Sequence, residues 1–113
     1  VELRSPDPAA NPYLALAVCL AAGMEGIREK ILPPKEISQN IFELNEEEKK
    51  ALGIECLPGS LMEAVEEFEK DAFIQKVLGE ELSQKFIKAK KAEYDRYRSH
   101  VSEWEMNEYL QKY

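Results

Sequence analysis

The strongest constraint on this chain is an uncharged, largely apolar stretch between residues 8 and 24. Asn11 followed by Pro12 is a helix-start signal, because the asparagine side chain can cap free backbone N–H groups and proline is tolerated at the first helical position. We therefore predict a helix over residues 11–30. Its first half, YLALAVCLAAGM, is apolar on every side. Such a helix needs neighbours all round, so we expect it to be buried inside a larger protein.

The same stretch is shorter than the ~20 residues of a membrane span, and Asn11 and Pro12 lie near its start. A buried helix is the better interpretation, and no membrane is expected as a partner. Gly23 and Gly26 can let another backbone approach closely, or end the helix early. The N-terminus carries charges and prolines where a signal peptide would be hydrophobic, and it starts with valine. We expect a piece cut from a larger, non-secreted protein.

Composition narrows the class of partner. The chain has 113 residues, of which 44% are hydrophobic and 33% charged, as in an ordinary folded domain. Its net charge of −7 repels polyanions, so no nucleic acid is expected as a partner. Acids dominate residues 36–71 and bases dominate residues 85–98, and these two segments can pair within the chain. Cys19 and Cys56 form no disulfide framework, which fits a reducing, cytoplasmic setting.

The sequence after residue 45 predicts several short amphipathic helices, so the fold class is mainly α. Helix-capping residues mark the expected starts at Asn45, Ser60, Asp71 and Ser102. A longer helix is expected from residue 80 to about residue 100, with its apolar side near Leu82, Phe86, Ala89, Tyr94 and Tyr97. Residues 31–44 have no clear period and are interpreted as a loop.

The last helix, after Ser102, has an unusual end. Its apolar stripe consists of Met106, Tyr109, Leu110 and Tyr113, so aromatic residues continue to the last position. Chain ends are normally polar and frayed. We expect the tail to dock, either on this chain or on another one.

Residues 1–5 alternate apolar and charged side chains, the period of a β-strand, and stop at the turn residues that follow. On a strand Glu2 and Arg4 point to the same face. A carboxylate is a hard oxygen ligand for Mg²⁺ or Mn²⁺, and a guanidinium forms two parallel hydrogen bonds to a carboxylate or phosphate. The alternative is a surface ion pair without function, and spacing alone does not separate the two.

Other candidate sites have weaker support. His100 is the only histidine, and a zinc site would need it to converge with both cysteines and a remote acid. Ser99 and His100 are neighbours on a helix, so they do not face each other as a nucleophile and base would. The lysine-rich helix contains Glu93 and Asp95 among its bases, which indicates a solvated face rather than a nucleic-acid stripe.

The run VELRSPDPAANPYLALAVCLAAGMEGI closely resembles the segment of bacterial-type (type I) glutamine synthetases in which the final catalytic strand meets a long buried helix. The runs NIFEL, LPGSLMEAVEEFEKD and KAKKAEYDRYRSHVSEWEMNEYLQKY resemble the family's following loop, helices and C-terminal end. The resemblance spans nearly all 113 residues. It implies that residues 1–113 are the C-terminal helical part of an α+β catalytic domain, comprising a strand (1–5), a buried helix (11–30) and a helical cluster with its tail (45–113).

The resemblance implies a role for two residues. The family's glutamate at the position of Glu2 binds one of two active-site divalent metals, Mg²⁺ or Mn²⁺, associated with the ATP phosphates. The arginine at the position of Arg4 binds the substrate L-glutamate. ATP phosphorylates the side-chain carboxylate of glutamate, and ammonia then displaces phosphate to give glutamine. The rest of each site lies upstream and between neighbouring subunits, so this chain alone is expected to be inactive.

The resemblance also implies features of regulation and assembly. Enterobacterial relatives carry a tyrosine that is adenylylated in the loop corresponding to NIFEL, whereas this chain has Phe42. Feedback inhibition is then the expected control. The tail resembles the branch of Gram-positive bacteria, whose C-terminus lies between two stacked six-subunit rings. The rival interpretation is a free-standing helical module that binds another protein through its aromatic tail.

Overall fold

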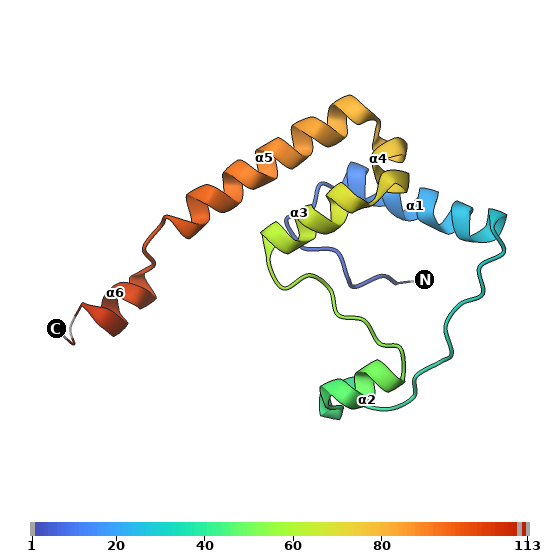
Figure 1. Cartoon of the computed structure of the whole chain (residues 1–113), viewed down its shortest axis with the longest axis horizontal. Helices are drawn as coiled ribbons and strands as arrows, with labels where there is room; N and C mark the ends of the chain where they lie inside the picture. The colour runs from blue at the N-terminus through green and yellow to red at the C-terminus, as the bar shows by residue number, and fades with distance from the viewer. Residues whose placement is uncertain (1, 111, 113) are drawn as a thin grey trace.

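The computed structural model describes residues 2–110 and 112, and its regular structure is helical (Figure 1). This confirms the mainly α fold class. The elements are, in chain order, α1 (Pro12–Arg28), η1 (Ile41–Glu43), α2 (Glu46–Ala51), α3 (Leu61–Lys70), α4 (Ala72–Leu78), α5 (Glu80–Arg98) and α6 (Glu103–Tyr109).

The predicted N-terminal strand does not form. Residues 2–5 are without regular secondary structure, and no strand occurs elsewhere in the described part of the chain. Val1, the first residue of that prediction, lies outside the described residues. The physical reason is that a strand needs a neighbour to accept and donate its backbone hydrogen bonds, and these residues have none here.

The helices start close to the positions predicted from the sequence, because a capping hydrogen bond joins residues only a few positions apart. Asn11 Oδ1 accepts hydrogen bonds from the backbone N–H of Tyr13 at 3.0 Å and of Leu14 at 3.3 Å, and α1 begins at the predicted place. The capping boxes predicted at Asn45 and Ser102 form in both directions. At Ser60 only the hydroxyl cap forms, since the carboxylate three residues later accepts from the Gly59 N–H instead.

Two helices end with the chain in the left-handed conformation. Gly53, at φ 68°, follows α2, and the N–H groups of Gly53 and Ile54 close the last turn on the carbonyls of Lys50 and Lys49. The same pair of hydrogen bonds ends α1, but its left-handed residue is Lys30, at φ 55°. The helix therefore continues through Gly26 and stops at Arg28, two residues before the predicted end.

The packed part of the molecule is formed by α3, α4 and α5, with α1 lying against α4. Val65 of α3 and Ile87 of α5 are its buried apolar side chains, at 4% and 5% exposure. Phe68 and Phe86 meet edge to face, with ring centroids 6.0 Å apart. A crevice of about 270 Å³ remains between α1 and this group, so the contact is loosely filled.

Polar contacts fix the corner between α4 and α5. Ser83 is fully buried, and its hydroxyl donates to the Gln75 carbonyl at 3.2 Å. The Gln75 amide donates to the carbonyls of Phe68 and Glu69, which ties α4 back to α3. The Lys91 ammonium and the Glu69 carboxylate pair at 2.7 Å, joining the basic segment to the acidic segment as the sequence suggested.

The buried side of α5 agrees only in part with the predicted one, since Phe86 and Tyr94 are half-buried as expected. It is centred on Ser83 and Ile87, whereas Leu82 is 41% exposed and Tyr97 is 77% exposed. Tyr97 lies beyond Lys91, the residue of α5 that pairs with Glu69 of α3, and close to the end of the helix.

The chain is open rather than compact. Its radius of gyration is 18.3 Å, against about 13 Å expected for a compact chain of this length. Residues 31–60 form an excursion that carries η1 and α2 away from the other helices, and α6 lies beyond the far end of α5 (Figure 1). None of the helices in the described residues is long and apolar enough to cross a membrane.

Prediction for the core. We expect Ile87→Ala to reduce the free energy of unfolding by about 2–5 kcal/mol, because it leaves a cavity between α3 and α5. Leu82→Ala on the same helix is the control, with a smaller expected loss because that side chain is half exposed. Urea denaturation followed by circular dichroism at 222 nm measures both. Equal losses in the two variants would contradict the assignment of this core.

Candidate functional site

The candidate site is the pair formed by Glu2 and Arg4, just before α1. Arg4 Nε donates to Glu2 Oε1 at 2.8 Å, and Arg4 Nη2 donates to Glu2 Oε2 at 3.3 Å. The two side chains lie on one side of the extended backbone, as the alternating pattern predicts. They are 72% and 84% exposed, so water screens their attraction.

The turn that follows holds this segment in front of α1. The Asp7 carboxylate accepts from the Ala9 N–H at 2.7 Å, and the Asp7 carbonyl accepts from the Ala10 N–H at 2.9 Å. Asn11 then starts α1. The orientation of the acid–guanidinium pair therefore depends on a short turn fixed by local hydrogen bonds, which the sequence indicates by its prolines and aspartate.

A hollow of about 660 Å³ lies beside this turn. It is lined by Ser5 and Asp7 from the N-terminal segment, by the loop leading into α3, and by Lys90 and Glu93 of α5. The Lys90 ammonium pairs with the Glu93 carboxylate at 2.7 Å and lies 5.8 Å from the centre of the Phe86 ring. The sequence analysis missed this arrangement, because it depends on how distant segments pack and no local pattern encodes it.

The described residues provide part of a metal site at most. Glu2 supplies a carboxylate of the kind that Mg²⁺ and Mn²⁺ prefer, on a side chain that is 72% exposed. No group of three or more His, Cys, Asp or Glu side chains that could hold an ion occurs in the described part of the chain. A divalent cation held by Glu2 would need further ligands from outside the described residues.

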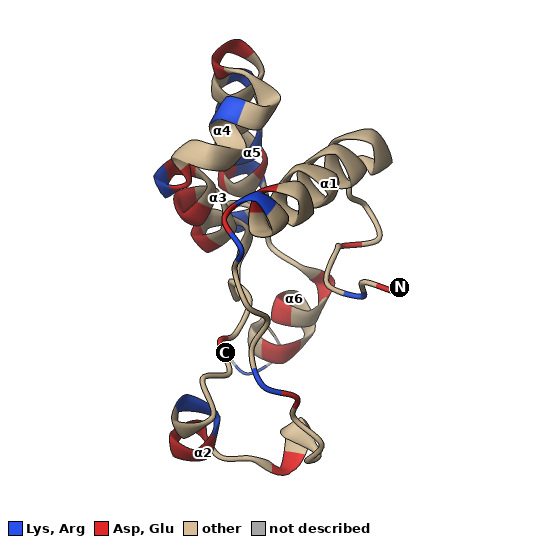
Figure 2. Ribbon diagram, turned by 90° about the vertical axis from the view of Figure 1, so that its right-hand side faces the viewer, with Lys and Arg blue, Asp and Glu red and all other residues tan. Residues whose placement is uncertain are grey.

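The other sequence candidates do not assemble into a site. Cys19 and Cys56 are both exposed free thiols. The Ser99 hydroxyl donates to carbonyls at the end of α5, so it serves the helix terminus. The basic residues of α5 are interleaved with acids to which Lys85, Lys90 and Arg98 are paired. Figure 2 shows acidic and basic residues mixed over the group formed by α3, α4 and α5.

The C-terminal helix presents a second candidate surface. Trp104 and Tyr109 meet edge to face, with centroids 6.0 Å apart. Both residues remain more than half exposed, as does Leu110, and Met106 is 46% exposed. Such an aromatic cluster is typical of a surface that a partner covers. Tyr113, which the sequence analysis placed on the same stripe, lies outside the described residues.

Comparison with known proteins defines the class of protein. Residues 1–109 match the family model of the glutamine synthetase catalytic domain. The chain therefore belongs to the glutamine synthetase family.

Individual relatives agree with the family match. The chain is 46% identical to the glutamine synthetase of Staphylococcus aureus (strain MW2) over 113 residues, which is all of this chain and 25% of that protein. It is 46% identical over 110 residues to the glutamine synthetases of Methanococcus voltae and Methanocaldococcus jannaschii, covering 97% of this chain and 25% and 24% of those proteins. The chain thus corresponds to a fragment of about a quarter of these relatives.

Prediction for the start of α6. The Ser102 backbone N–H and hydroxyl both donate to the Glu105 carboxylate at 2.8 Å and hold its pKa below the ordinary value of 4.5. A lowered pKa in the folded state stabilises it above pH 4.5, and this contribution is lost as the pH falls through the folded-state pKa. We expect Ser102→Ala to move the pKa of Glu105 up toward the ordinary value, measured by carbon NMR of the side-chain carboxyl during a pH titration.

The control is Ser99→Ala, whose hydroxyl bonds to α5 carbonyls and does not touch Glu105. We expect it to leave the pKa of Glu105 unchanged. A wild-type Glu105 that titrates at 4.5 or above would contradict the capping geometry.

Proposed function

We propose that this chain is the C-terminal part of a glutamine synthetase catalytic domain, contributing Glu2 and Arg4 to an active site that ligates ammonia to L-glutamate at the expense of ATP. The family match over residues 1–109 supports the enzyme class. The observation that carries the site is the hydrogen-bonded Glu2–Arg4 pair, exposed in front of α1. An acid and a guanidinium held side by side can meet a cation and an anionic substrate at neighbouring positions.

Each side chain has a chemical task in this proposal. Arg4 offers Nε and Nη2 in one plane, the geometry that holds a carboxylate of L-glutamate by two parallel bonds. Glu2 supplies one oxygen ligand to Mg²⁺ or Mn²⁺. When bound, the divalent ion offsets negative charge on the ATP phosphates and on the phosphoryl group in transfer. In the absence of ligands, Glu2 and Arg4 neutralise each other. In this proposal the pair separates on binding, when a cation takes the place of Arg4 beside Glu2 and a substrate carboxylate takes the place of Glu2 beside Arg4.

The chain has no catalytic group of its own in this proposal. The nucleotide pocket, the other metal ligands and the ammonia site belong to the part of the enzyme that this chain does not contain. We propose that the isolated chain is inactive and that the whole enzyme works in the cytoplasm. A free-standing interaction module is the rival function, and an active site restored by this chain in a larger enzyme would exclude it.

Prediction for the site. The test replaces the matching quarter of the S. aureus glutamine synthetase with this chain and measures glutamine formation. We expect Glu2→Ala and Arg4→Ala to lower kcat/KM by about 100-fold or more each, since each removes a contact made by the reacting groups. Glu2→Ala should also weaken Mn²⁺ binding by at least about tenfold, measured by electron paramagnetic resonance.

Two exposed residues away from the site provide matched controls. Glu36→Ala and Arg96→Ala remove the same side-chain types, and we expect activity within about twofold of the parent, as for surface changes in general. If Glu2→Ala or Arg4→Ala kept near-normal turnover, the assignment of that residue would be wrong.

Regulation and assembly follow from two exposed regions. Phe42 on η1 is 99% exposed and has no hydroxyl, so it cannot accept a nucleotide. We propose that the enzyme is controlled by feedback inhibition rather than by adenylylation at this position. We also propose that α6 and the tail contact a second subunit where two six-subunit rings stack, because the Trp104–Tyr109 cluster is exposed in the single chain.

Prediction for assembly. In the same chimeric enzyme, Trp104→Ser should shift the assembly from double rings toward single rings, because the substitution removes an exposed aromatic side chain that we expect to anchor the contact between rings. Analytical ultracentrifugation measures the two species. Phe42→Ser is the control, a still more exposed aromatic outside the tail, and should leave double rings intact. Double rings in both variants would place the ring contact elsewhere.

A further inference from the structure

Helix α1 has two apolar sides, of which this chain covers one. Leu14, Ala15 and Val18 line the crevice toward α4 and Phe86 and are half-buried. The opposite side carries large apolar residues that are exposed by 51–83%: Tyr13, Leu16, Leu20, Met24 and Ile27. We call these five residues the outer stripe of α1.

The outer stripe has the geometry of a packing face. Its members follow one another at intervals of three or four residues, which places them along one side of a helix. No charged residue occurs in α1 before Glu25. Figure 2 shows α1 without charged residues over most of its length. An uncharged row of large apolar residues is costly in water, so a partner surface is expected.

Two glycines next to the stripe are not explained by this chain. Gly23 and Gly26 lie inside α1, where glycine is less favourable than alanine. A Cβ added at either position would meet nothing within 4 Å. Neither glycine has positive φ, so neither is needed for the backbone conformation. Open space at both positions leaves room for a close approach from outside the chain.

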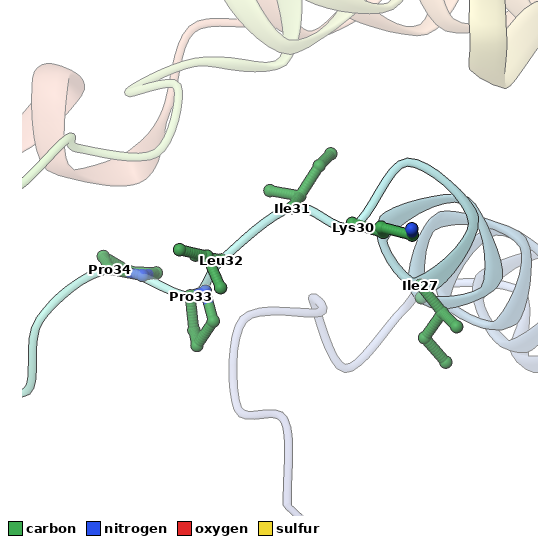
Figure 3. A pocket seen from close by; sticks show the side chains of 8 residues that line it. Ile27, Lys30, Ile31, Leu32, Pro33 and Pro34 are labelled. Carbon is green, nitrogen blue, oxygen red and sulfur yellow. The ribbon is translucent and has the colours of Figure 1, made fainter.

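The outer stripe continues into an apolar hollow at the end of α1. The hollow has a volume of about 460 Å³ and is lined by Gly23, Gly26, Ile27, Lys30 and the segment Ile31–Pro34 (Figure 3). Lys30 has a left-handed backbone conformation and ends the helix. The chain then leaves the helix end, and the segment Ile31–Pro34 forms the other side of the hollow. Leu32 is 86% exposed and Ile31 is 68% exposed.

We propose that the outer stripe, the two glycines and the hollow form one docking surface for the remainder of the catalytic domain, with apolar side chains of that remainder filling the hollow. The occupant is inferred from size, since the chain spans only a quarter of the length of its relatives and its radius of gyration exceeds that of a compact chain of this length. A second copy of this chain is less suitable, because each copy carries a net charge of −7.

This inference rests on the proposed function in one respect, namely that the chain works as part of a longer catalytic domain. It does not depend on what Glu2 and Arg4 bind. The two can therefore fail separately.

The experiment measures association of the whole 113-residue chain, fluorescently labelled, with the complementary three quarters of the S. aureus glutamine synthetase produced without its matching quarter. We expect Leu20→Ser to weaken association by at least about tenfold, because a large apolar contact is lost. Leu57→Ser is the matched control, the same residue type at 68% exposure in a loop, against 70% for Leu20. We expect it to associate like the wild-type chain.

The glycines supply a second, sign-sensitive readout. Gly23→Ala should increase the helicity of the isolated chain, measured by circular dichroism, because alanine favours a helix and nothing blocks its methyl group. The same change should weaken association by about tenfold or more, since the methyl group occupies space that the partner fills. If Gly23 served only the structure of this chain, higher helicity would not be accompanied by weaker association.

Several outcomes would overturn the proposal: no association of the wild-type chain, an equal loss with Leu20→Ser and Leu57→Ser, or unweakened association of Gly23→Ala. The wild-type chain could instead form homodimers that Leu20→Ser dissociates and that the complementary piece does not disrupt. That result would assign the surface to a second copy of the chain. A complex that forms as expected but makes no glutamine would contradict the proposed function and leave the docking surface standing.

Discussion

The structure depends on one constraint: helix α1 has more apolar surface than the rest of the chain can cover. α1 is apolar on all sides along most of its length, and α4 covers only one of those sides. The described residues bury just two apolar side chains, Val65 and Ile87, so the interior that they form is small. Hydrophobic stabilisation grows with the apolar area removed from water, and most of that area in α1 stays outside. The open shape, the loosely filled crevice beside α4 and the exposed tail all follow from this shortage of covering surface.

Local features of the fold could be predicted from sequence because their causes lie within a few residues. The caps at Asn11, Asn45 and Ser102 satisfy free backbone N–H groups from side chains at most three residues away. Apart from the pairing of the acidic and basic segments through Lys91 and Glu69, features that depend on distant contacts were not predicted. Residues 1–5 alternate in sequence as a strand does, but residues 2–5 have no neighbouring strand and are irregular. On α5 the pattern suggested Leu82 and Tyr97 as inward residues, whereas contact with α3 and α4 selects Ser83 and Ile87.

The candidate site shows the same division. Alternation along an extended backbone places Glu2 beside Arg4, and the two hydrogen bonds between them follow from that geometry. The family was recognisable from residue order alone, and the match over residues 1–109 confirms it. The roles of the two side chains are not encoded in their spacing, because an exposed ion pair of this kind is common and contributes little to stability. Only the groups that face the pair in the whole enzyme can give it a chemical task.

The length of α5 has a mechanical consequence for α6. Nineteen residues of α-helix extend about 28 Å, and contacts with α3 and α4 reach along it from Ser83 to Lys91, which pairs with Glu69. The seven residues beyond Lys91, about 10 Å of helix, form a lever arm that leads to the aromatic cluster. A tilt of one degree at Lys91 displaces the end of this arm by about 0.2 Å, as simple geometry on that length requires. A substitution at Ile87 that tilts α5 would therefore also change the direction in which Trp104 and Tyr109 face.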